Sequence, residues 1–246
     1  MKLCDDVYLI GSGSLGFDWT HPADCNVYAV DTGDGVVLVD SGTGLSADDL
    51  LDHLAGHGFR PDQVTHILLT HLHADHSGGA AALRKKTGAK IVVLEAAARV
   101  FEAGREEDIE LPRARRAGYY PEDYRWQGCK ADVELHDRDI MQIGKYQFQA
   151  LHTPGHSSFD TCFYIPDRTS PMLFSGDTVM YGGKISLLNT ADFSLGRLAN
   201  SIETLSRLSL ERLFPGHGQP ALNRASQHIG KAHRIFSNMG VPESIV

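Results

Sequence analysis

The stretch that decides the fold runs over residues 65–79 and reads Thr65-His66-Ile67-Leu68-Leu69-Thr70-His71-Leu72-His73-Ala74-Asp75-His76-Ser77-Gly78-Gly79. Its first five residues have the apolar and β-branched character of a buried strand. Four side chains of the metal-ligating types follow within six residues, from His71 to His76. A chance cluster of solvated histidines explains this density poorly. The loop after the strand is therefore predicted to be a functional site, because sites are often built on loops that a rigid strand positions.

The spacing inside this loop predicts how the side chains share metal ions. In an extended segment, residues two apart point to the same side, so His71 and His73 can face one ion. Asp75 and His76 are adjacent and diverge, which would place them at a second ion nearby. The six residues therefore predict part of a two-metal site.

Working outward, short apolar runs alternate with amphipathic segments in both halves of the chain. Ser46 is predicted to cap the first helix, with two aspartates in its first turn. An apolar run over residues 210–214 separates the last two helices. Strands are predicted at Val7–Ile10, Asn26–Val30, Val36–Val39, Thr65–Leu69, Ile91–Leu94, Val133–Leu135, Tyr146–Leu151, Thr161–Ile165 and Met172–Phe174. Helices are predicted at Ala47–Gly56, from Gly78-Gly79 through Lys86, at Arg197–Arg207 and at Arg224–Asn238.

This alternation predicts an α/β fold, a layered sandwich with helices outside. The 246 residues fit one large domain, 1–246, and no linker marks a boundary within it. Residues 99–130 break the rhythm with a run of arginines and aromatic residues. Two interpretations stay open for them: a solvated helix pair, or a cap insertion whose aromatic side chains line a substrate entrance.

Composition excludes several function classes. The formal net charge of −8 argues against a broad nucleic-acid surface, which needs basic residues. No apolar run of 18 residues predicts a membrane span, and the first residues lack the pattern of a signal peptide. The four cysteines have no CxxC spacing, which favours reduced thiols in a cytoplasmic protein.

Three further polar residues lie in turn-rich contexts after predicted strands. They are His156, Asp177 and His217, and each has a glycine beside it that permits a close backbone approach to a cofactor. Each is a weak signal when taken alone.

Taken together, the motifs resemble those of the metallo-β-lactamase superfamily, in the expected order from about residue 7 to 220. The resemblance implies a four-layer αββα sandwich with the metal site at one edge. It is carried by the ligand-rich loop Thr70–Gly79, and by Leu38-Val39-Asp40-Ser41-Gly42, Thr153-Pro154-Gly155-His156, Ser175-Gly176-Asp177-Thr178 and Pro215-Gly216-His217-Gly218.

The resemblance also implies a role for each ligand residue. His71, His73 and His156 would hold the first metal. Asp75, His76 and His217 would hold the second, and Asp177 would bridge both. Two divalent ions are implied, with zinc favoured and iron or manganese left open. Asp40 is a candidate acceptor that orients a ligand histidine, although it could also be a simple turn residue.

The implied activity is hydrolysis, in which a hydroxide between the two metals attacks the carbonyl of a small ester, thioester or lactone. Asp75 would also help to orient that hydroxide. The alternatives are an oxidoreductase with a single iron that resembles persulfide dioxygenases, and a β-lactam or phosphodiester hydrolase of the same fold. A small-molecule substrate is expected, with no nucleic-acid or membrane partner, and a homodimer is left open.

Within the superfamily, the chain looks closest to the glyoxalase II-like and N-acyl-homoserine-lactonase-like groups. The glycine-cysteine-glycine-arginine run of glyoxalase II after the bridging aspartate is missing here. Lactonases often place a tyrosine three residues after that aspartate, and here Tyr181 lies four residues after it, as a candidate catalytic oxyanion helper. Lys184 and Asn189 are candidates to bind a substrate carboxylate or carbonyl.

Residues 11–16 match the GxGxxG pattern, but the residues after them do not predict the helix that a dinucleotide-binding site requires. A flexible loop beside the metal site is the better interpretation. Phe17 and Trp19 are then candidates to line the substrate pocket.

Overall fold

The computed structural model describes residues 1–246. They divide into two compact units, Met1–Leu135 (unit 1) and His136–Val246 (unit 2). Each unit contains one β-sheet. The single domain predicted for residues 1–246, with its cap insertion, stays a prediction.

Unit 1 is built on a mixed sheet whose strands follow the order of the chain. The first three strands pair in antiparallel fashion, and the third to sixth pair in parallel. The first three strands are apolar and almost wholly buried, as expected for strands covered on both faces. The strands are β1 (Val7–Gly11), β2 (Val27–Asp31), β3 (Val36–Val39), β4 (Val64–Leu68), β5 (Lys90–Leu94) and β6 (Val133–Leu135).

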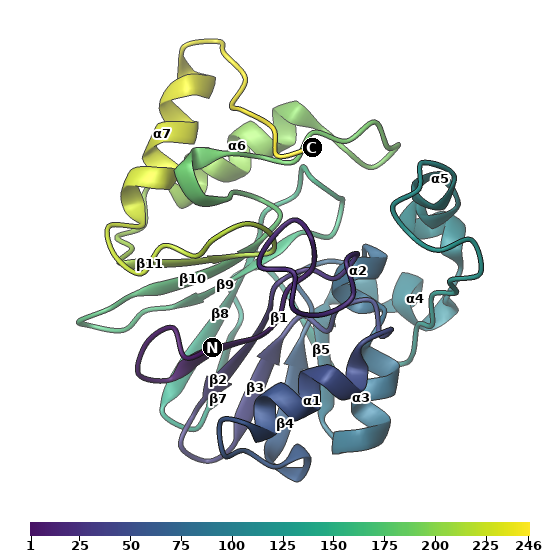
Figure 1. The fold of residues 1–246 in the computed structure, drawn as a ribbon. Helices are drawn as coiled ribbons and strands as arrows, with labels where there is room; N and C mark the ends of the chain where they lie inside the picture. Colours follow the sequence, from purple (N-terminus) through teal and green to yellow (C-terminus); the bar gives the residue numbers. More distant parts are fainter. The chain divides into compact units, whose positions relative to one another are not determined.

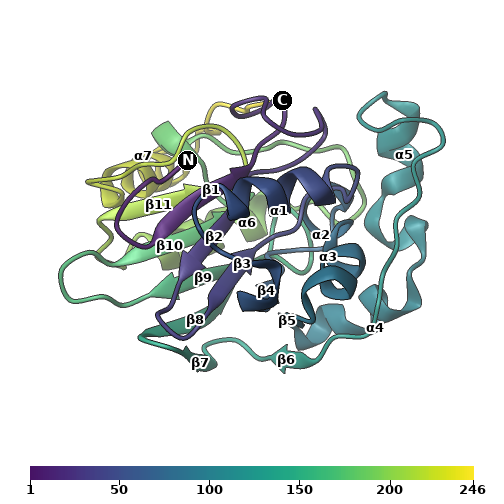
Figure 2. The same cartoon turned by 60° about the horizontal axis from the view of Figure 1, so that its bottom comes forward.

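Helices pack against this sheet, with α1 at β1, α3 at β4 and β5, and α4 at β5 and β6 (Figures 1 and 2). The short helix α5 lies farther from the sheet than α4 does (Figure 2). The helices are α1 (Ala47–Ala55), α2 (Ala74–Ser77), α3 (Ala80–Thr87), α4 (Glu95–Ala103) and α5 (Leu111–Arg116), with the 3₁₀ turns η1 (Pro61–Gln63) and η2 (Glu106–Ile109).

Unit 2 has a sheet with the strand order β11-β10-β9-β8-β7, in which only β10 and β11 pair in parallel. Its strands are β7 (Ile140–Ile143), β8 (Tyr146–His152), β9 (Thr161–Ile165), β10 (Met172–Gly176) and β11 (Arg212–Pro215). The turn η3 (Tyr181–Gly183) and the helices α6 (Leu195–Leu205) and α7 (Ser226–Ser237) complete it.

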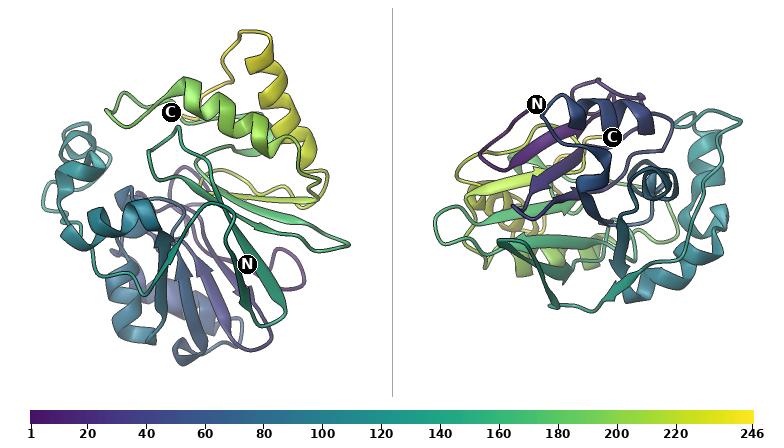
Figure 3. Two further views of the ribbon diagram at one scale, coloured as in Figure 1. Left: turned by 180° about the vertical axis from the view of Figure 1, so that it is seen from behind. Right: turned by 90° about the horizontal axis from the view of Figure 1, so that it is seen from below.

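The core of unit 2 lies between its sheet and its two long helices, which pack against each other (Figure 3). Leu198 and Ile202 on α6 and Ile229 on α7 are fully buried or nearly so. They belong to one apolar cluster with Leu173 and Leu213 on the sheet. Burial of this apolar surface is the main source of stability for such a layer.

The predicted strands and helices are present, with three local differences. Strand β7 was not predicted, because it is an edge strand whose Ile140 is 58% exposed and whose alternation is weak. Ser46 precedes α1 but does not cap it, and its Oγ instead accepts the backbone N–H of His21. The chain also becomes helical earlier than Gly78-Gly79, because α2 already begins at Ala74.

The irregular segment 99–130 forms the end of α4, then η2 and α5, and continues without regular structure. Phe101, Ile109 and Leu111 are buried, so these turns carry an apolar side and are not wholly solvated.

Two further expectations concern the whole chain. No helix is long and apolar enough to cross a membrane. All four cysteines are free thiols, two of them buried.

Gly79 joins two loops of unit 1 in a contact that only glycine allows. Its N–H donates to Gly42 O over 2.9 Å, and an added Cβ would collide with the backbone oxygen of Ser41. The loop after β3 and the loop after β4 are thereby fixed to each other.

We expect Gly79→Ala to lower the free energy of unfolding by about 1–3 kcal/mol, because the added carbon must push a backbone carbonyl aside. Urea denaturation followed by circular dichroism measures this change. Gly196→Ala is the control, since an added Cβ in α6 meets no atom within 4 Å, and it should be neutral or slightly stabilising. Equal stabilities of the two variants would contradict the account.

Candidate metal centre

The ligand loop of unit 1 follows β4 at the edge where the parallel strands end. Val39, the last residue of β3, pairs with Leu68, the last residue of β4. The residues that follow these two strands, Asp40 and Thr70, therefore lie side by side. This edge is where open α/β sheets usually build their sites.

The Asp40 carboxylate is the buried centre of this edge. Its Oδ1 accepts the backbone N–H of Thr70 over 2.8 Å, and the Thr70 hydroxyl donates to the same carboxylate. Its Oδ2 lies 2.8 Å from Nδ1 of His76. Asp40 adopts a positive φ of 63°, a conformation that aspartate tolerates better than most residues.

These contacts favour one tautomer of the neutral ring in two of the predicted ligand histidines. A carboxylate only accepts, so the His76 Nδ1 carries the proton and its Nε2 keeps a lone pair. The Thr70 hydroxyl donates its hydrogen bond to Asp40. Its oxygen can therefore accept from His71 Nδ1, which lies 3.1 Å away. His71 Nδ1 is therefore also the donor, and its Nε2 is left to bind a cation. The predicted orienting role of Asp40 is consistent with this geometry.

Within unit 1, the predicted ligands form two pairs of donor atoms. His71 Nε2 lies 3.2 Å from His73 Nδ1. His76 Nε2 lies 3.4 Å from Asp75 Oδ2. These are the two pairs that the spacing predicts to share an ion, and their division between two ions stays a prediction.

The other three predicted ligands come together within unit 2. Asp177 and His217 follow the parallel neighbours β10 and β11, and His156 lies in the loop after β8. One carboxylate oxygen, Asp177 Oδ2, lies 3.5 Å from His156 Nε2 and 3.4 Å from His217 Nε2. All three side chains are buried. One oxygen of Asp177 therefore lies at a similar distance from both imidazoles, and its bridging role stays a prediction.

The donor spacing within each unit fits a divalent metal. Two nitrogen or oxygen ligands bound to one tetrahedral zinc at its usual bond length lie about 3.3 Å apart. The four separations above fall close to this value, and the donors are imidazoles and carboxylates. The histidine and aspartate clusters can therefore hold metal ions.

One residue near the ligands was not predicted individually. The Tyr120 hydroxyl donates to Asp75 Oδ1 over 2.9 Å. Burial, and then the charge of Asp75, raise the pKa of Tyr120 well above its ordinary value, so the hydroxyl keeps its proton and remains a donor. The aromatic character of segment 99–130 was the only signal for this contact in the sequence.

The candidates for substrate contact lie in varied surroundings. The Tyr181 ring packs against His228, with the ring centroids 4.3 Å apart, and the side chain is 39% exposed. The Lys184 ammonium forms an ion pair with Glu243 over 2.6 Å. Asn189 is exposed. The catalytic role of Tyr181 stays a prediction.

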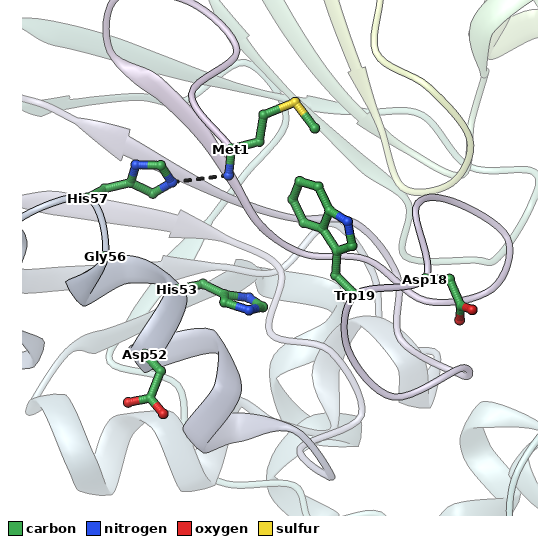
Figure 4. A pocket seen from close by; sticks show the side chains of 7 residues that line it. All are labelled: Met1, Asp18, Trp19, Asp52, His53, Gly56 and His57. Atoms are coloured by element: carbon green, nitrogen blue, oxygen red, sulfur yellow. Dashed lines mark hydrogen bonds between the residues drawn. The ribbon is translucent and has the colours of Figure 1, made fainter.

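Trp19 lines a pocket of about 590 Å³ at the side of α1, together with His53 and His57 (Figure 4). His53 Nδ1 lies 2.7 Å from Ile10 O, whereas His57 Nε2 lies 3.0 Å from the Met1 amine. The Phe17 ring lies 5.7 Å from that of Trp19. The pocket is lined by none of the predicted metal ligands.

Known proteins resemble this chain over most of its length. The acyl-coenzyme A thioesterase MBLAC2 of Bos taurus is 30% identical over 84% of this chain and 79% of its own. A hydroxyacylglutathione hydrolase from Polaromonas sp. is 32% identical over 70% of this chain and 56% of its own.

Solved structures confirm the predicted fold class. The subclass B3 metallo-beta-lactamase BJP-1 of Bradyrhizobium japonicum superposes with a TM-score of 0.73, covering 97% of this chain and 91% of its own, at 22% identity. At that identity the likeness shows the metallo-β-lactamase fold alone.

The family model described as "Metallo-beta-lactamase superfamily" matches residues 22–217, a range that contains every predicted metal ligand. The motifs, the donor geometry of each unit and this match agree. The chain belongs to the metallo-beta-lactamase superfamily.

Proposed function

We propose that this metallo-β-lactamase-fold hydrolase cleaves acyl thioesters, with a coenzyme A thioester as the substrate class to be tested first. The observation that carries the proposal is the donor geometry of the two clusters, combined with relatives whose names specify acyl-thiol substrates. One relative is named as an acyl-coenzyme A thioesterase and another as a hydroxyacylglutathione hydrolase.

We assign His71, His73 and His156 to a first metal ion, and Asp75, His76 and His217 to a second, with Asp177 bridging the two. The spacing of the donor atoms supports the groupings within each unit, His71 with His73, Asp75 with His76, and Asp177 with His156 and His217. Zinc is favoured by the mixture of imidazole and carboxylate ligands. When bound, two such ions activate water near neutral pH and polarise a carbonyl.

The chain's own residues prepare this chemistry. Asp40 and Thr70 hold the imidazoles of His71 and His76 in the tautomers that leave Nε2 available. Asp75 and Asp177 supply negative charge that balances the cations. Asp177 is buried and Asp75 is partly buried, so the interactions of Asp177 in particular act in a low dielectric.

A covalent mechanism on Cys162 or Cys129 is not supported. Burial raises the pKa of the Cys162 thiol to about 12, and burial also raises that of Cys129. A cysteine nucleophile must be a thiolate, and both thiols remain protonated at neutral pH. Direct hydrolysis by activated water fits the site better.

The carrier group of the substrate is argued from the segment after Asp177. It lacks the glycine-cysteine-glycine-arginine run of glyoxalase II. Its Lys184 forms a solvent-exposed ion pair with Glu243. The missing run argues against a glutathione thioester, and the relative named as an acyl-coenzyme A thioesterase supports coenzyme A as the carrier.

The setting proposed for this activity is the cytoplasm, with a small-molecule substrate and no nucleic-acid or membrane partner. The four free thiols and the net charge of −8 support this part of the proposal. A homodimer stays a prediction.

The test is turnover of a substrate panel by zinc-loaded protein. The panel contains a short-chain acyl-coenzyme A, a hydroxyacyl thioester of glutathione, an acyl-homoserine lactone and a β-lactam. We expect the coenzyme A thioester to have the highest kcat/KM. His76→Ala should lower this kcat/KM at least about a hundredfold, because a proposed ligand of the second metal ion is lost.

His136→Ala is the matched control, since His136 is exposed and lies outside both donor clusters, and its kcat/KM should stay within about twofold of wild type. A preference for the lactone or the β-lactam would contradict the thioester assignment. Absence of turnover on the whole panel by zinc-loaded protein would refute the hydrolase proposal.

A second prediction concerns Asp40. In Asp40→Asn, the new amide must point an N–H either at the Thr70 N–H or at the His76 Nδ1–H, so one donor faces another donor. We expect zinc affinity to fall about 10–100-fold, as measured by competition with a chromophoric chelator.

Asp24→Asn is the control for this experiment. Asp24 is also a buried aspartate of unit 1, but its Oδ1 accepts both hydrogen bonds from Thr43, and its Oδ2 can become an amide without loss of a bond. Its zinc affinity should stay close to wild type. Equal affinities of the two variants would show that Asp40 does not orient the ligands.

A further inference from the structure

A segment outside the predicted ligand set touches the ligand loop of unit 1. We call residues 119–126 the tyrosine strap. Tyr120 donates to Asp75 Oδ1 over 2.9 Å. The other oxygen of the same carboxylate, Oδ2, lies 3.4 Å from His76 Nε2. One oxygen of Asp75 therefore bonds Tyr120, and the other lies beside His76, a predicted ligand of the second metal ion.

The strap holds the loop at two further points. The Tyr124 hydroxyl donates to Thr43 O over 2.9 Å and lies 3.4 Å from Ala74 O. Trp126 Nε1 donates to Ser77 Oγ over 2.9 Å, and Ser77 Oγ in turn bonds Leu72 O. These contacts reach both ends of α2, the short helix that carries Asp75 and His76.

The close approach of the strap depends on Gly78. A Cβ at this position would collide with the Tyr124 hydroxyl and crowd Ala74 O. The Tyr120 and Tyr124 rings also stack, with centroids 5.3 Å apart and an angle of 17° between the planes. Tyr120 is thus held in place by a neighbour that is itself anchored to the loop.

We propose that Tyr120 is a positioning residue, which fixes the rotation of the Asp75 carboxylate so that Oδ2 alone is presented to the second metal ion. The inference rests on the proposed ligand set.

The hydrogen bond from Tyr120 restrains the terminal torsion of the Asp75 side chain. The terminal torsion of an aspartate side chain is broad, so an unrestrained carboxylate samples many orientations. A hydroxyl that donates to a charged oxygen is among the stronger hydrogen bonds of a protein. With Oδ1 held by the phenol, the second metal receives one oxygen in a prepared direction, and the ordering of the carboxylate is complete before the metal binds.

The test is a zinc titration of the metal-free full chain against a chromophoric chelator, resolved into a first and a second Kd. Tyr120→Phe removes one oxygen atom and keeps the stacked ring. We expect its second Kd to rise about 10–100-fold while the first stays within about twofold, because partners of ligand side chains have effects of this size.

Two neighbouring tyrosines supply matched variants. Tyr119→Phe alters an adjacent tyrosine that is 56% exposed and should leave both Kd values unchanged. Tyr124→Phe removes the anchor to Thr43 and Ala74 but leaves the Tyr120 hydroxyl in place. It should lower the Tm without a selective rise of the second Kd.

Several results would overturn the inference. They are two Kd values within about twofold of wild type in Tyr120→Phe, an equal rise of both, or a wild-type chain that binds only one zinc ion. The titration needs no substrate, so it separates this inference from the proposed activity. A wild type that binds two zinc ions, shows the selective loss in Tyr120→Phe and hydrolyses no thioester would refute the activity alone.

Discussion

The arrangement of the predicted metal site in unit 1 depends on the hydrogen bonds that the Asp40 carboxylate accepts. The carboxylate accepts from the Thr70 backbone, the Thr70 hydroxyl and the His76 ring, all in the interior. Through Thr70 it also sets the tautomer of His71. One buried charge therefore joins the loop after β3 to the loop after β4. It also orients one predicted ligand of each metal ion, His71 for the first and His76 for the second. A buried carboxylate is costly unless it is fully bonded, and here its hydrogen bonds offset that cost.

Strand pairing explains why polar side chains of the predicted site gather in each unit. In unit 1, the parallel pair β3 and β4 places Asp40 beside Thr70. In unit 2, the parallel pair β10 and β11 does the same for the loops that carry Asp177 and His217. Each sheet therefore presents its polar loops at the carboxyl ends of its strands, where backbone groups are released from pairing. In unit 2, topology brings together predicted ligands that lie far apart in the sequence, whereas the four predicted ligands of unit 1 come from one loop.

Much of this was predictable from the sequence, for physical reasons that differ by residue. The pairing of His71 with His73 and of Asp75 with His76 follows from local alternation and adjacency, which the chain carries in its own spacing. His156, Asp177 and His217 were weak signals one at a time, and became specific only through their order along the chain. The family match shows the superfamily that this order indicates, and the roles of the three residues stay predictions. The contact of Tyr120 with Asp75 was beyond prediction, because it joins residues 45 positions apart through an irregular segment. The same holds for Ser46, whose hydroxyl bonds the distant His21 and not its own helix.

The proposed function requires that the donor sets of the two units serve one centre with two metal ions. The most direct measurement is zinc content per chain, by mass spectrometry, after loading and removal of loosely bound metal. The account predicts about two zinc ions in the wild type, and about one in His217→Ala, which removes a ligand of the second ion only. A wild-type content of one ion or none would contradict it, as would an unchanged content in His217→Ala.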